Sequence, residues 1–379
     1  MLDEVKNKKK IVFLFSDTGG GHRSAAEAII EALKNEFPQR YSYEMVDFFK
    51  DYSPPPFNLA GPVYPAMSRL EYLWKRSFEV SNNPDRIRVI YSMLWPYIRN
   101  DMYKLLDEHP CDLFVSVHPL VNIPILRAMR KRSLRCPYLI VVTDLVSTHT
   151  AWYAKEADLV IIPTNKAVRR AIKSNVDPEK IKVIGLPVDE KFRKSEKTRD
   201  ALRLEYGWPD DTPVVLLVGG GEGMGPLEEI AKAINDECFG AGLAIVTGRN
   251  HRLKQKLDKT NWSIPAYIYG FRKDMPDLMR AADILITKAG PGTISEALIS
   301  GLPIILYHRI PGQEEGNVSY VLDEGAGIWA PEITDIVSAL KNWLDHPEKR
   351  VEAVKNAERI AKPNASIEIA KVISGYLER

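Results

Sequence analysis

A pattern that occurs twice constrains the fold of this chain more than any other feature. Each time, a short apolar run leads directly into a glycine-rich turn, and apolar residues at helical spacing follow. The first copy joins Ile11–Phe15 to the turn Ser16–His22, and the second joins Val214–Val218 to Gly219–Gly225. A buried strand, a glycine turn and a helix form the opening unit of an open parallel sheet. The sequence therefore predicts an α/β protein with two Rossmann-like domains and a cleft between them.

Further short apolar runs supply the remaining strands of the two predicted sheets. These runs are Leu113–Val117, Tyr138–Val142, Leu159–Ile162, Leu243–Thr247, Ala266–Tyr269, Ile284–Thr287 and Pro303–Leu306. Helical segments lie between them, as parallel strands require. The first series stops near Val188, so the predicted domains are 1–188 and 189–360. A last helix within 361–379 is compatible with packing back onto the first domain.

Composition limits the class of protein. With 379 residues, 45% hydrophobic and 27% charged, the chain is long enough for two ordinary globular domains. The formal net charge of +2 argues against nucleic acid as a partner, and Lys6–Lys10 is typical of a solvated tail. Three cysteines without metal spacing predict a reducing compartment. No apolar stretch reaches the roughly 18 residues that span a bilayer, so we expect a cytoplasmic protein that meets a membrane only from its surface.

The stretch from Asp51 to Arg99 differs from the rest of the chain. It contains three consecutive prolines and many aromatic side chains, among them Tyr72, Trp74 and Trp95, with Arg and Lys interleaved. One interpretation is a helical insertion whose aromatic rings form core. The other is an amphipathic surface that docks on a membrane, because mixed aromatic and basic side chains suit the interfacial zone.

Polar side chains follow three strands of the first predicted domain. His22 ends the first glycine turn, His118 follows Leu113–Val117, and Asp144 follows Tyr138–Val142. Open α/β sheets bind ligands at the carboxyl edge of their strands. A neutral imidazole there can accept a proton from an alcohol, so His22 is a candidate base, with helix capping as the simpler alternative. Asp144 is a second candidate, either as the base or as the group that orients His22.

Two glycine turns of the second domain suit a diphosphate. Glycines let an anion approach the backbone, and the N–H groups of the following helix point toward it. One turn is Gly219–Gly225, where a purely structural role is the alternative; the other is Thr287–Thr293, where Lys288 can meet a phosphate. We expect Glu296 in the first turn of a helix over Ile294–Ile299. There it could accept ribose hydrogen bonds or simply respond to the helix dipole.

The loop Gly312–Asn317 follows the predicted strand Pro303–Leu306. It is dense with side chains that hydrogen-bond sugar hydroxyls. A solvated surface loop is the simpler interpretation of the same residues.

Seven motifs in order resemble those of the monogalactosyldiacylglycerol synthases. That family is related to the bacterial processive diacylglycerol glucosyltransferases and, more distantly, to the MurG-type transferases. The motifs are SDTGGGHR (Ser16–Arg23), SVHPL (Ser116–Leu120), TDL (Thr143–Leu145), GLPV (Gly185–Val188), GGGEGMGP (Gly219–Pro226), KAGPGT (Lys288–Thr293) and GQEEGN (Gly312–Asn317). The resemblance covers nearly the whole chain. It implies a GT-B fold, in which the second domain mainly holds the nucleotide sugar and the first holds the acceptor.

The resemblance also implies a reaction. It is the inverting transfer of galactose from UDP-galactose to 1,2-diacylglycerol, giving monogalactosyldiacylglycerol. A base must activate the lipid hydroxyl while positive dipoles stabilise the departing UDP. The implied partners are UDP-galactose or UDP-glucose, diacylglycerol and a membrane surface, with anionic lipids as candidate activators. No cofactor and no metal is implied, and the chain has no Asp-x-Asp motif.

The resemblance assigns roles to single residues. His22 is the first choice for the base and for sensing anionic lipid, and Asp144 is the second choice for the base. The acceptor and lipid site is expected to include Gly21, Pro56, His118 and Trp152. The UDP-sugar site is expected to include Gly219, Gly220, Gly221, Gly223, Met224, Arg249, Phe271, Arg272, Lys288, Gly290, Gly292, Thr293, Glu296, Gln313, Glu314 and Asn317.

These donor-site residues divide by the part of the nucleotide sugar they are expected to bind. The glycine loop and Lys288 line the diphosphate, and Glu296 binds the ribose. Phe271 and Arg272 cover the uracil. The hexose lies among Gln313, Glu314 and Asn317.

The chain departs from the plant members of the family. It has Glu315 where they have Ala, and Ser147–Ala151 where they have a Cys-His-Pro stretch. It lacks their longer leader, so we expect a bacterial protein. Because some bacterial relatives use glucose, UDP-glucose stays open as the donor. Two alternatives come from other functional classes. One is a non-catalytic binding module, which the two glycine loops disfavour. The other is a sugar-nucleotide 2-epimerase of the same fold, which the insertion after Asp51 disfavours.

Overall fold

The computed structural model describes residues 8–17, 20–55, 57–59, 70–237 and 240–378, which form two compact units. The first unit comprises Met1–Glu190, Pro311–Gln313 and Asn364–Arg379, and the second comprises Lys191–Ile310 and Glu314–Pro363. The predicted division into an acceptor domain and a UDP-sugar domain concerns ligands and stays a prediction.

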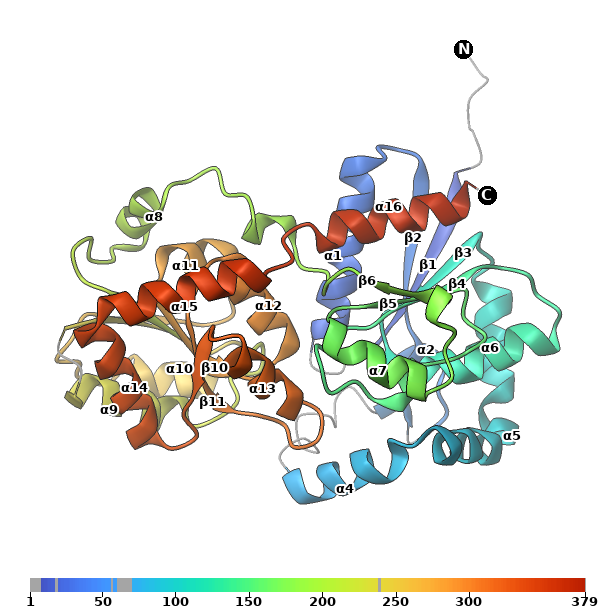
Figure 1. Ribbon diagram of the computed structural model, residues 1–379, viewed down its shortest axis with the longest axis horizontal. Coiled ribbons are helices and arrows are strands. Elements are labelled where there is room, and N and C mark those ends of the chain that lie inside the picture. The colour runs from blue at the N-terminus through green and yellow to red at the C-terminus, as the bar shows by residue number, and fades with distance from the viewer. Residues whose placement is uncertain (1–7, 18–19, 56, 60–69, 238–239, 379) are drawn as a thin grey trace, which may run out of the picture. The chain divides into compact units, whose positions relative to one another are not determined.

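The first unit is built on a parallel sheet, whose described strands have the order β2-β1-β3-β4-β5-β6 (Figure 1). The strands are β1 (Lys9–Phe15), β2 (Tyr41–Asp47), β3 (Leu113–Ser116), β4 (Tyr138–Val141), β5 (Leu159–Ile162) and β6 (Ile181–Val183). The inner strands are continuously apolar because helices cover both faces of the sheet.

Alternate residues of β1 show how these helices are placed. Val12 and Leu14 pack in a core formed with α2 (Phe48–Tyr52), α5 (Pro84–Glu108), α6 (Asn122–Lys131) and α7 (Asn165–Lys173). Ile11 and Phe13 pack on the other face with α1 (Gly21–Glu36) and α16 (Ala365–Leu377). The last helix therefore lies beside the first in this unit, as the red and blue ribbons of Figure 1 show.

The second unit contains another parallel sheet, with the order β12-β11-β10-β7-β8-β9 among its described strands. These strands are β7 (Val214–Val218), β8 (Gly242–Val246), β9 (Ala266–Tyr269), β10 (Ile284–Lys288), β11 (Ile304–His308) and β12 (Gly327–Trp329). The other α-helices among the described residues are α4 (Glu71–Ser81) in the first unit, and α8 (Arg199–Tyr206), α9 (Leu227–Glu237), α10 (His251–Leu257), α11 (Met275–Ala281), α12 (Pro291–Ile299), α13 (Glu315–Asp323), α14 (Ile333–Asp345) and α15 (Pro347–Ile360) in the second.

The order of the described strands reverses once in each sheet. In the first sheet the reversal lies between β1 and β3, and in the second it lies between β7 and β10. Ligands of open α/β sheets bind outside the carboxyl ends of the strands at such a switch point. His22, His118 and the loop Gly219–Gly225 follow β1, β3 and β7, and Lys288 is the last residue of β10. Topology therefore places the predicted motifs at the two positions where ligand sites form.

Candidate active site

His22 projects from the first turn of α1, at the carboxyl edge of the first sheet. The helix begins at Gly21, and its N-cap Gly20 has a φ of 79°, which favours glycine. The Nδ1 atom of His22 lies 2.9 Å from the Thr143 hydroxyl. Burial lowers the pKa of His22 to about 4, against the opposing effect of a hydrogen bond to the Val117 backbone. The ring is therefore neutral at physiological pH and able to accept a proton.

His118 approaches His22 edge-on, with 4.5 Å between the two ring centroids. Its Nδ1 accepts a hydrogen bond from the Leu120 N–H at 3.3 Å. The rings of Phe48 and Phe49 lie 5.0 and 5.5 Å from it. Burial, followed by the nearby His22, lowers the pKa of His118 well below 6.5. Two neutral imidazoles therefore lie among aromatic rings at this edge of the sheet.

Asp144 is anchored to Trp152. The Trp152 Nε1–H donates to Oδ2 of Asp144 at 2.6 Å, and within the same unit Gln313 Nε2 donates to Oδ1 at 3.3 Å. Trp152 is fully buried, and its ring centroid lies 6.1 Å from that of His22. Sequence reasoning offered Asp144 as the group that orients His22, but in the structure Thr143 bonds the ring. The role of Asp144 as an alternative base stays a prediction.

Thr143 is the residue that sequence reasoning missed in this unit. It lies in the quoted TDL motif, immediately after β4, yet it received no role. A hydroxyl at a strand end next to a predicted catalytic edge was the available signal, because such a group can orient a facing side chain. The structure places these predicted site residues at one edge of the first unit: Gly21, His22, His118, Asp144, Trp152 and Gln313. Pro56 lies outside the described residues.

The loop Gly219–Gly225 of the second unit is closed by its own backbone. The Met224 N–H donates to the Gly219 carbonyl at 2.8 Å. Gly223 has a φ of 59°, and a Cβ there would lie 2.1 Å from the Thr247 carbonyl oxygen, so backbone packing alone explains this glycine. A Cβ on Gly221 would meet only Arg249 Nη1, at 3.5 Å. Gly221 is therefore the glycine of this pair whose surroundings leave room for a phosphate.

The N-terminus of α12 forms the other half of this switch point. The helix has Gly290 as its N-cap and Pro291 at its first position, so the N–H groups of Gly292 and Thr293 have no carbonyl partner within the helix. A Cβ on Gly292 would meet nothing within 4 Å. Because the helix starts at Pro291 rather than at the predicted Ile294, Glu296 lies in the second turn and not the first. The expected dipole effect on Glu296 is therefore wrong, while its ribose role stays a prediction.

Lys288 and Glu314 form an ion pair in this unit, with 2.8 Å between Nζ and Oε1. The Ile310 N–H donates to the other carboxylate oxygen, also at 2.8 Å. Glu314 is buried, and the Cβ of a residue at Gly220 would lie 3.6 Å from Lys288 Cε. With both of its oxygens engaged, Glu314 is suited to position Lys288 beside the glycine loop. Its predicted contact with the hexose stays untested.

Two amide oxygens of the sugar loop have no hydrogen-bond partner in the described structure. They are Oε1 of Gln313 and Oδ1 of Asn317, and both are buried. The amide nitrogen of Asn317 donates to the Ala289 carbonyl at 2.9 Å, which fixes the side chain. A buried polar atom without a partner is costly. Each oxygen is therefore a candidate acceptor for a ligand hydroxyl.

Arg249, Phe271 and Arg272 are the predicted donor-site residues near β9. Arg249 and Phe271 contact each other, whereas Arg272 has other partners. Arg249 lies over the Phe271 ring at 4.6 Å and pairs with Glu222 at 2.7 Å. Arg272 is turned to Asp274, whose hydrogen bond raises the pKa of the guanidinium, and to the Tyr269 ring. Phe271 is 48% exposed and remains a candidate for base stacking. The Arg272 guanidinium contacts Asp274 and the Tyr269 ring instead, and its predicted contact with the uracil stays a prediction.

The segment Asp51–Arg99 contains both buried and exposed aromatic residues. Tyr91 and Trp95 are buried in core clusters, and Arg127 lies over the Trp95 ring at 4.6 Å. A membrane-docking role for Trp95 is therefore wrong. Other large apolar side chains of α4, its N-cap and α5 are exposed, and we refer to them as the α4/α5 surface: Leu70, Tyr72, Leu73, Val80, Val89, Met93 and Tyr97.

Two family models together match most of the chain. Residues 22–188 match the model of monogalactosyldiacylglycerol (MGDG) synthase, and residues 214–371 match the glycosyltransferase family 28 C-terminal domain. The first match covers His22, His118 and Asp144. The second covers both glycine turns of the second unit.

The chain is 37% identical to monogalactosyldiacylglycerol synthase 1, chloroplastic, of Arabidopsis thaliana, over 97% of this chain and 70% of the relative. It is also 37% identical to the monogalactosyldiacylglycerol synthase, chloroplastic, of Spinacia oleracea, over 97% of this chain and 72% of the relative. The chain belongs to the monogalactosyldiacylglycerol synthase family. As a member it is a hexosyltransferase that acts on diacylglycerol, and the predicted family and enzyme class are confirmed.

Solved structures confirm the GT-B fold. MurG of Acinetobacter baumannii superposes with a TM-score of 0.58 at 16% identity, covering 97% of this chain and 99% of its own. HepE of Anabaena in complex with UDP-glucose superposes with a TM-score of 0.58 at 16% identity, covering 98% of this chain and 99% of its own. MnaA of S. aureus, in a UDP co-structure, superposes with a TM-score of 0.65 at 15% identity, covering 98% of this chain and 97% of its own. At these identities the similarity establishes the fold alone.

Proposed function

We propose that this protein transfers galactose from UDP-galactose to diacylglycerol at a membrane surface, with inversion at the anomeric carbon. The observation that carries the proposal is the 37% identity to proteins named monogalactosyldiacylglycerol synthases across 97% of the chain. The relatives do not favour UDP-glucose as the donor, nor a non-catalytic binding module. The sugar-nucleotide epimerases share only the fold.

The acceptor chemistry follows from the neutral state of His22. In the proposed step, the lipid hydroxyl oxygen bonds to the anomeric carbon while the bond from that carbon to the UDP oxygen breaks. The hydroxyl proton passes to the His22 ring, and UDP leaves with the bonding electron pair. A low pKa keeps the ring unprotonated before the reaction, and Thr143 fixes its orientation through Nδ1.

The donor chemistry is supported by groups of the second unit. The N–H groups at the start of α12 and the Lys288 ammonium offer positive charge to a diphosphate. The Oδ1 atom of Asn317 offers an acceptor to a sugar hydroxyl. Among the residues that the structure describes, no group of three or more His, Cys, Asp or Glu could hold a metal. That transfer needs neither a metal nor a cofactor remains part of the proposal.

The α4/α5 surface supports a location on a membrane. Its Tyr72 and Met93 side chains are 74% and 75% exposed, and the basic residues Lys75 and Arg76 lie one turn after Tyr72 on α4. Amphipathic helices of this kind bind the interfacial zone of anionic bilayers. In the described part of the chain, none of the helices combines the length and apolarity needed to cross a bilayer. We propose peripheral binding at the cytoplasmic face of a bacterial membrane, with anionic lipids as activators.

The test offers UDP-galactose and UDP-glucose separately to the purified protein with diacylglycerol in mixed micelles. Mass and sugar analysis then identify the lipid products. A galactolipid from UDP-galactose alone supports the proposal, and a glucolipid alone would move the protein to glucosyl transfer. His22→Ala should reduce transfer at least 100-fold while UDP binding persists. Lys34→Ala, on the exposed face of the same helix, is the matched control.

A further inference from the structure

The end of helix α4 packs on the glycine that precedes Gln313. Gly312 and Gln313 belong to the first unit, as does α4. The ring of Phe78, in the last turn of α4, lies so close to Gly312 that an added Cβ would be 2.9 Å from Cδ1 and 3.3 Å from Cγ. Gly312 also has a φ of 82°, in the left-handed region that favours glycine. The aromatic ring therefore rests directly on the backbone beside Gln313, where a side chain would clash with it.

The same end of α4 contacts a second segment, which begins with His149 and Thr150. The Phe78 ring meets the His149 ring with 5.0 Å between their centroids and an angle of 67° between their planes. The Ser81 hydroxyl lies 3.1 Å from His149 Nε2. Asn82, the C-cap of the helix, accepts a hydrogen bond from the Thr150 N–H at 2.9 Å. A ring contact and two hydrogen bonds thus attach this segment to the end of α4.

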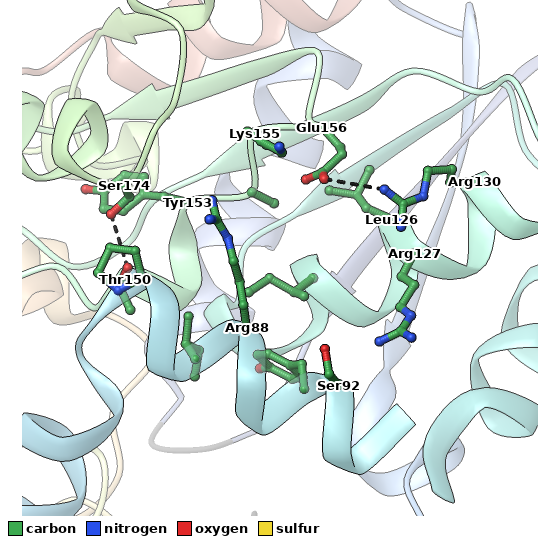
Figure 2. A pocket seen from close by; sticks show the side chains of 15 residues that line it. Arg88, Ser92, Leu126, Arg127, Arg130, Thr150, Tyr153, Lys155, Glu156 and Ser174 are labelled. Carbon is green, nitrogen blue, oxygen red and sulfur yellow. Dashed lines mark hydrogen bonds and ion pairs between the residues drawn. The ribbon is translucent and has the colours of Figure 1, made fainter. Parts of the chain in front are cut away.

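Both segments lead to Asp144. Thr150 is the first residue of η3, a 3₁₀ helix that ends at Trp152, and its hydroxyl lies 3.1 Å from that of Ser174 (Figure 2). At the end of η3, the Trp152 indole N–H donates to Asp144 Oδ2 at 2.6 Å. The Gln313 amide donates to the other carboxylate oxygen at 3.3 Å. Each oxygen of Asp144 is therefore bonded to a residue from one of the two segments that α4 contacts.

Asp144 also determines which way the Gln313 amide faces. A carboxylate accepts hydrogen bonds, so the amide nitrogen turns toward Asp144 and Oε1 must point away from it. This Oε1 atom is buried and has no hydrogen-bond partner in the described structure. Because a buried acceptor without a donor is costly, the arrangement favours a ligand that supplies a hydroxyl. Gln313 is thus fixed at its backbone and at its amide nitrogen, and it presents one oxygen for binding.

We propose that Phe78 is a positioning residue for galactosyl transfer and that it acts through Gln313. The Phe78 ring fixes the Gly312 backbone, and Asp144 fixes the amide group. The Oε1 atom of Gln313 then accepts a hydrogen bond from a hydroxyl of the transferred hexose. The proposal rests on the proposed function, which supplies the hexose, and it adds an aromatic residue of α4 to the groups that determine the affinity for UDP-galactose.

Binding is tested by calorimetry on the full chain with UDP-galactose and with UDP, without a lipid acceptor so that no galactosyl transfer takes place. Phe78→Ala should weaken UDP-galactose binding about fivefold to tenfold, because Gln313 loses its fixed position, and should leave UDP binding unchanged. Glu79→Ala, at the next and exposed position of α4, is the matched control and should bind both ligands normally. Equal weakening of both ligands by Phe78→Ala would show general damage to the protein and overturn the role, as would no weakening.

Two further variants separate positioning from a merely structural contribution. Phe78→Tyr keeps an aromatic ring on Gly312 and should restore UDP-galactose binding. Gln313→Ala removes the amide through which Phe78 is proposed to act, so the affinity for UDP-galactose should fall, and adding Phe78→Ala should cause no further loss. A double variant in which the two losses multiply would overturn the coupling between the residues. An unchanged affinity of Gln313→Ala would overturn the assignment of its oxygen.

Transfer to diacylglycerol in mixed micelles distinguishes this inference from the proposed function. In Phe78→Ala the KM for UDP-galactose should rise by the same factor as its dissociation constant. If the unaltered protein makes galactolipid and Phe78→Ala leaves this KM unchanged, the positioning role fails while the proposed function stands. If Phe78→Ala weakens UDP-galactose binding alone but the unaltered protein makes no galactolipid, the positioning of Gln313 stands and the proposed acceptor is wrong.

Discussion

The imidazole rings of His22 and His118 meet edge-on with 4.5 Å between their centroids, at the point where the first sheet reverses its strand order. His22 follows β1 and His118 follows β3, so the contact is a direct product of topology. Two imidazolium cations could not lie so close in a buried site without a large cost. Burial keeps both rings neutral by lowering their pKa values. The edge proposed to bind the lipid therefore combines aromatic side chains with a neutral imidazole that could act as the base.

Thr143→Val should lower the rate of transfer without changing the fold. The substitution keeps the shape of the side chain and removes the hydroxyl that lies 2.9 Å from His22 Nδ1. A lost hydrogen bond of this kind is worth about 1 kcal/mol, so we expect kcat to fall roughly fivefold to tenfold. The KM for UDP-galactose should stay constant. Thr143→Ser keeps the hydroxyl and should restore kcat; equal rates for Val and Ser variants would remove Thr143 from the mechanism.

The pH dependence of kcat should show an acid limb well below the ordinary histidine pKa of 6.5. Because the pKa of His22 is lowered to about 4, the base stays unprotonated until the pH approaches that value. Initial rates in mixed micelles between about pH 5 and 8 should therefore show no loss attributable to this ring. A limb centred near 6.5 would contradict the lowered pKa of His22.

Stability should fall as the medium becomes acidic, and His149 provides a separate test. Burial lowers the pKa of His149 from 6.5 to about 4, so between these values the unfolded chain binds the extra proton. The free energy of unfolding must therefore decrease as pH falls through this window, and it levels off below about 4. His149→Asn keeps an acceptor for the Ala151 N–H and removes the titration. Urea unfolding at pH 7 and pH 5 should show a smaller difference for this variant than for the unaltered protein.

The inner strands of both sheets could be predicted from sequence, whereas three edge strands could not. Inner strands are covered on both faces, so they appear as continuous apolar runs. The missed strands β2, β6 and β12 all lie at sheet edges. In β6, for example, two of three residues are exposed. These three strands are only partly covered and lack a continuous apolar run. The edge strand β9 was predicted because its residues Ala266–Tyr269 do form such a run.

The positions of the site residues could be predicted, but their partners could not. Parallel strands necessarily bring their carboxyl ends to one edge, so strand-end residues such as His22 and Lys288 are recognisable from order alone. Which neighbour each side chain bonds depends on side-chain direction over distances of a few ångströms. Two interactions were missed for this reason. Thr143, and not Asp144, hydrogen-bonds His22, and Glu314 forms an ion pair with Lys288.

Two glycines should respond oppositely to alanine. At Gly223 the added Cβ would lie 2.1 Å from a carbonyl oxygen in a left-handed backbone, so Gly223→Ala should lower the free energy of unfolding by 2 kcal/mol or more, in order-of-magnitude terms. At Gly292 the Cβ meets nothing, and alanine favours a helix by roughly 0.5–1 kcal/mol. Gly292→Ala should therefore leave stability equal or higher, yet weaken UDP binding if a diphosphate approaches that N-terminus. Thermal unfolding and calorimetry with UDP check both expectations.

Glu314→Gln should destabilise the second unit. The substitution leaves an acceptor for the Ile310 N–H but removes the charge that pairs with Lys288 in a buried setting. Breaking such a pair typically costs on the order of 3 kcal/mol. Glu332→Gln, at an exposed position of the same unit, should cost close to nothing. Equal midpoints of urea unfolding for the two variants would show that the pair adds little.

Membrane binding should depend on the α4/α5 surface and not on the buried tryptophan between its residues. Replacing Tyr72 and Met93 together by serine removes two side chains that are about three-quarters exposed, so vesicle flotation should fall about tenfold with stability unchanged. Leu204→Ser, at a 79% exposed position of α8, is the control and should float normally.

Trp95→Ala should instead destabilise the first unit by about 3–5 kcal/mol, because that ring packs in the core. Mild denaturant separates the two effects: unfolding midpoints should shift for Trp95→Ala and not for the serine pair. Normal flotation of the serine pair would show that the exposed apolar residues of α4 and α5 face something other than a bilayer.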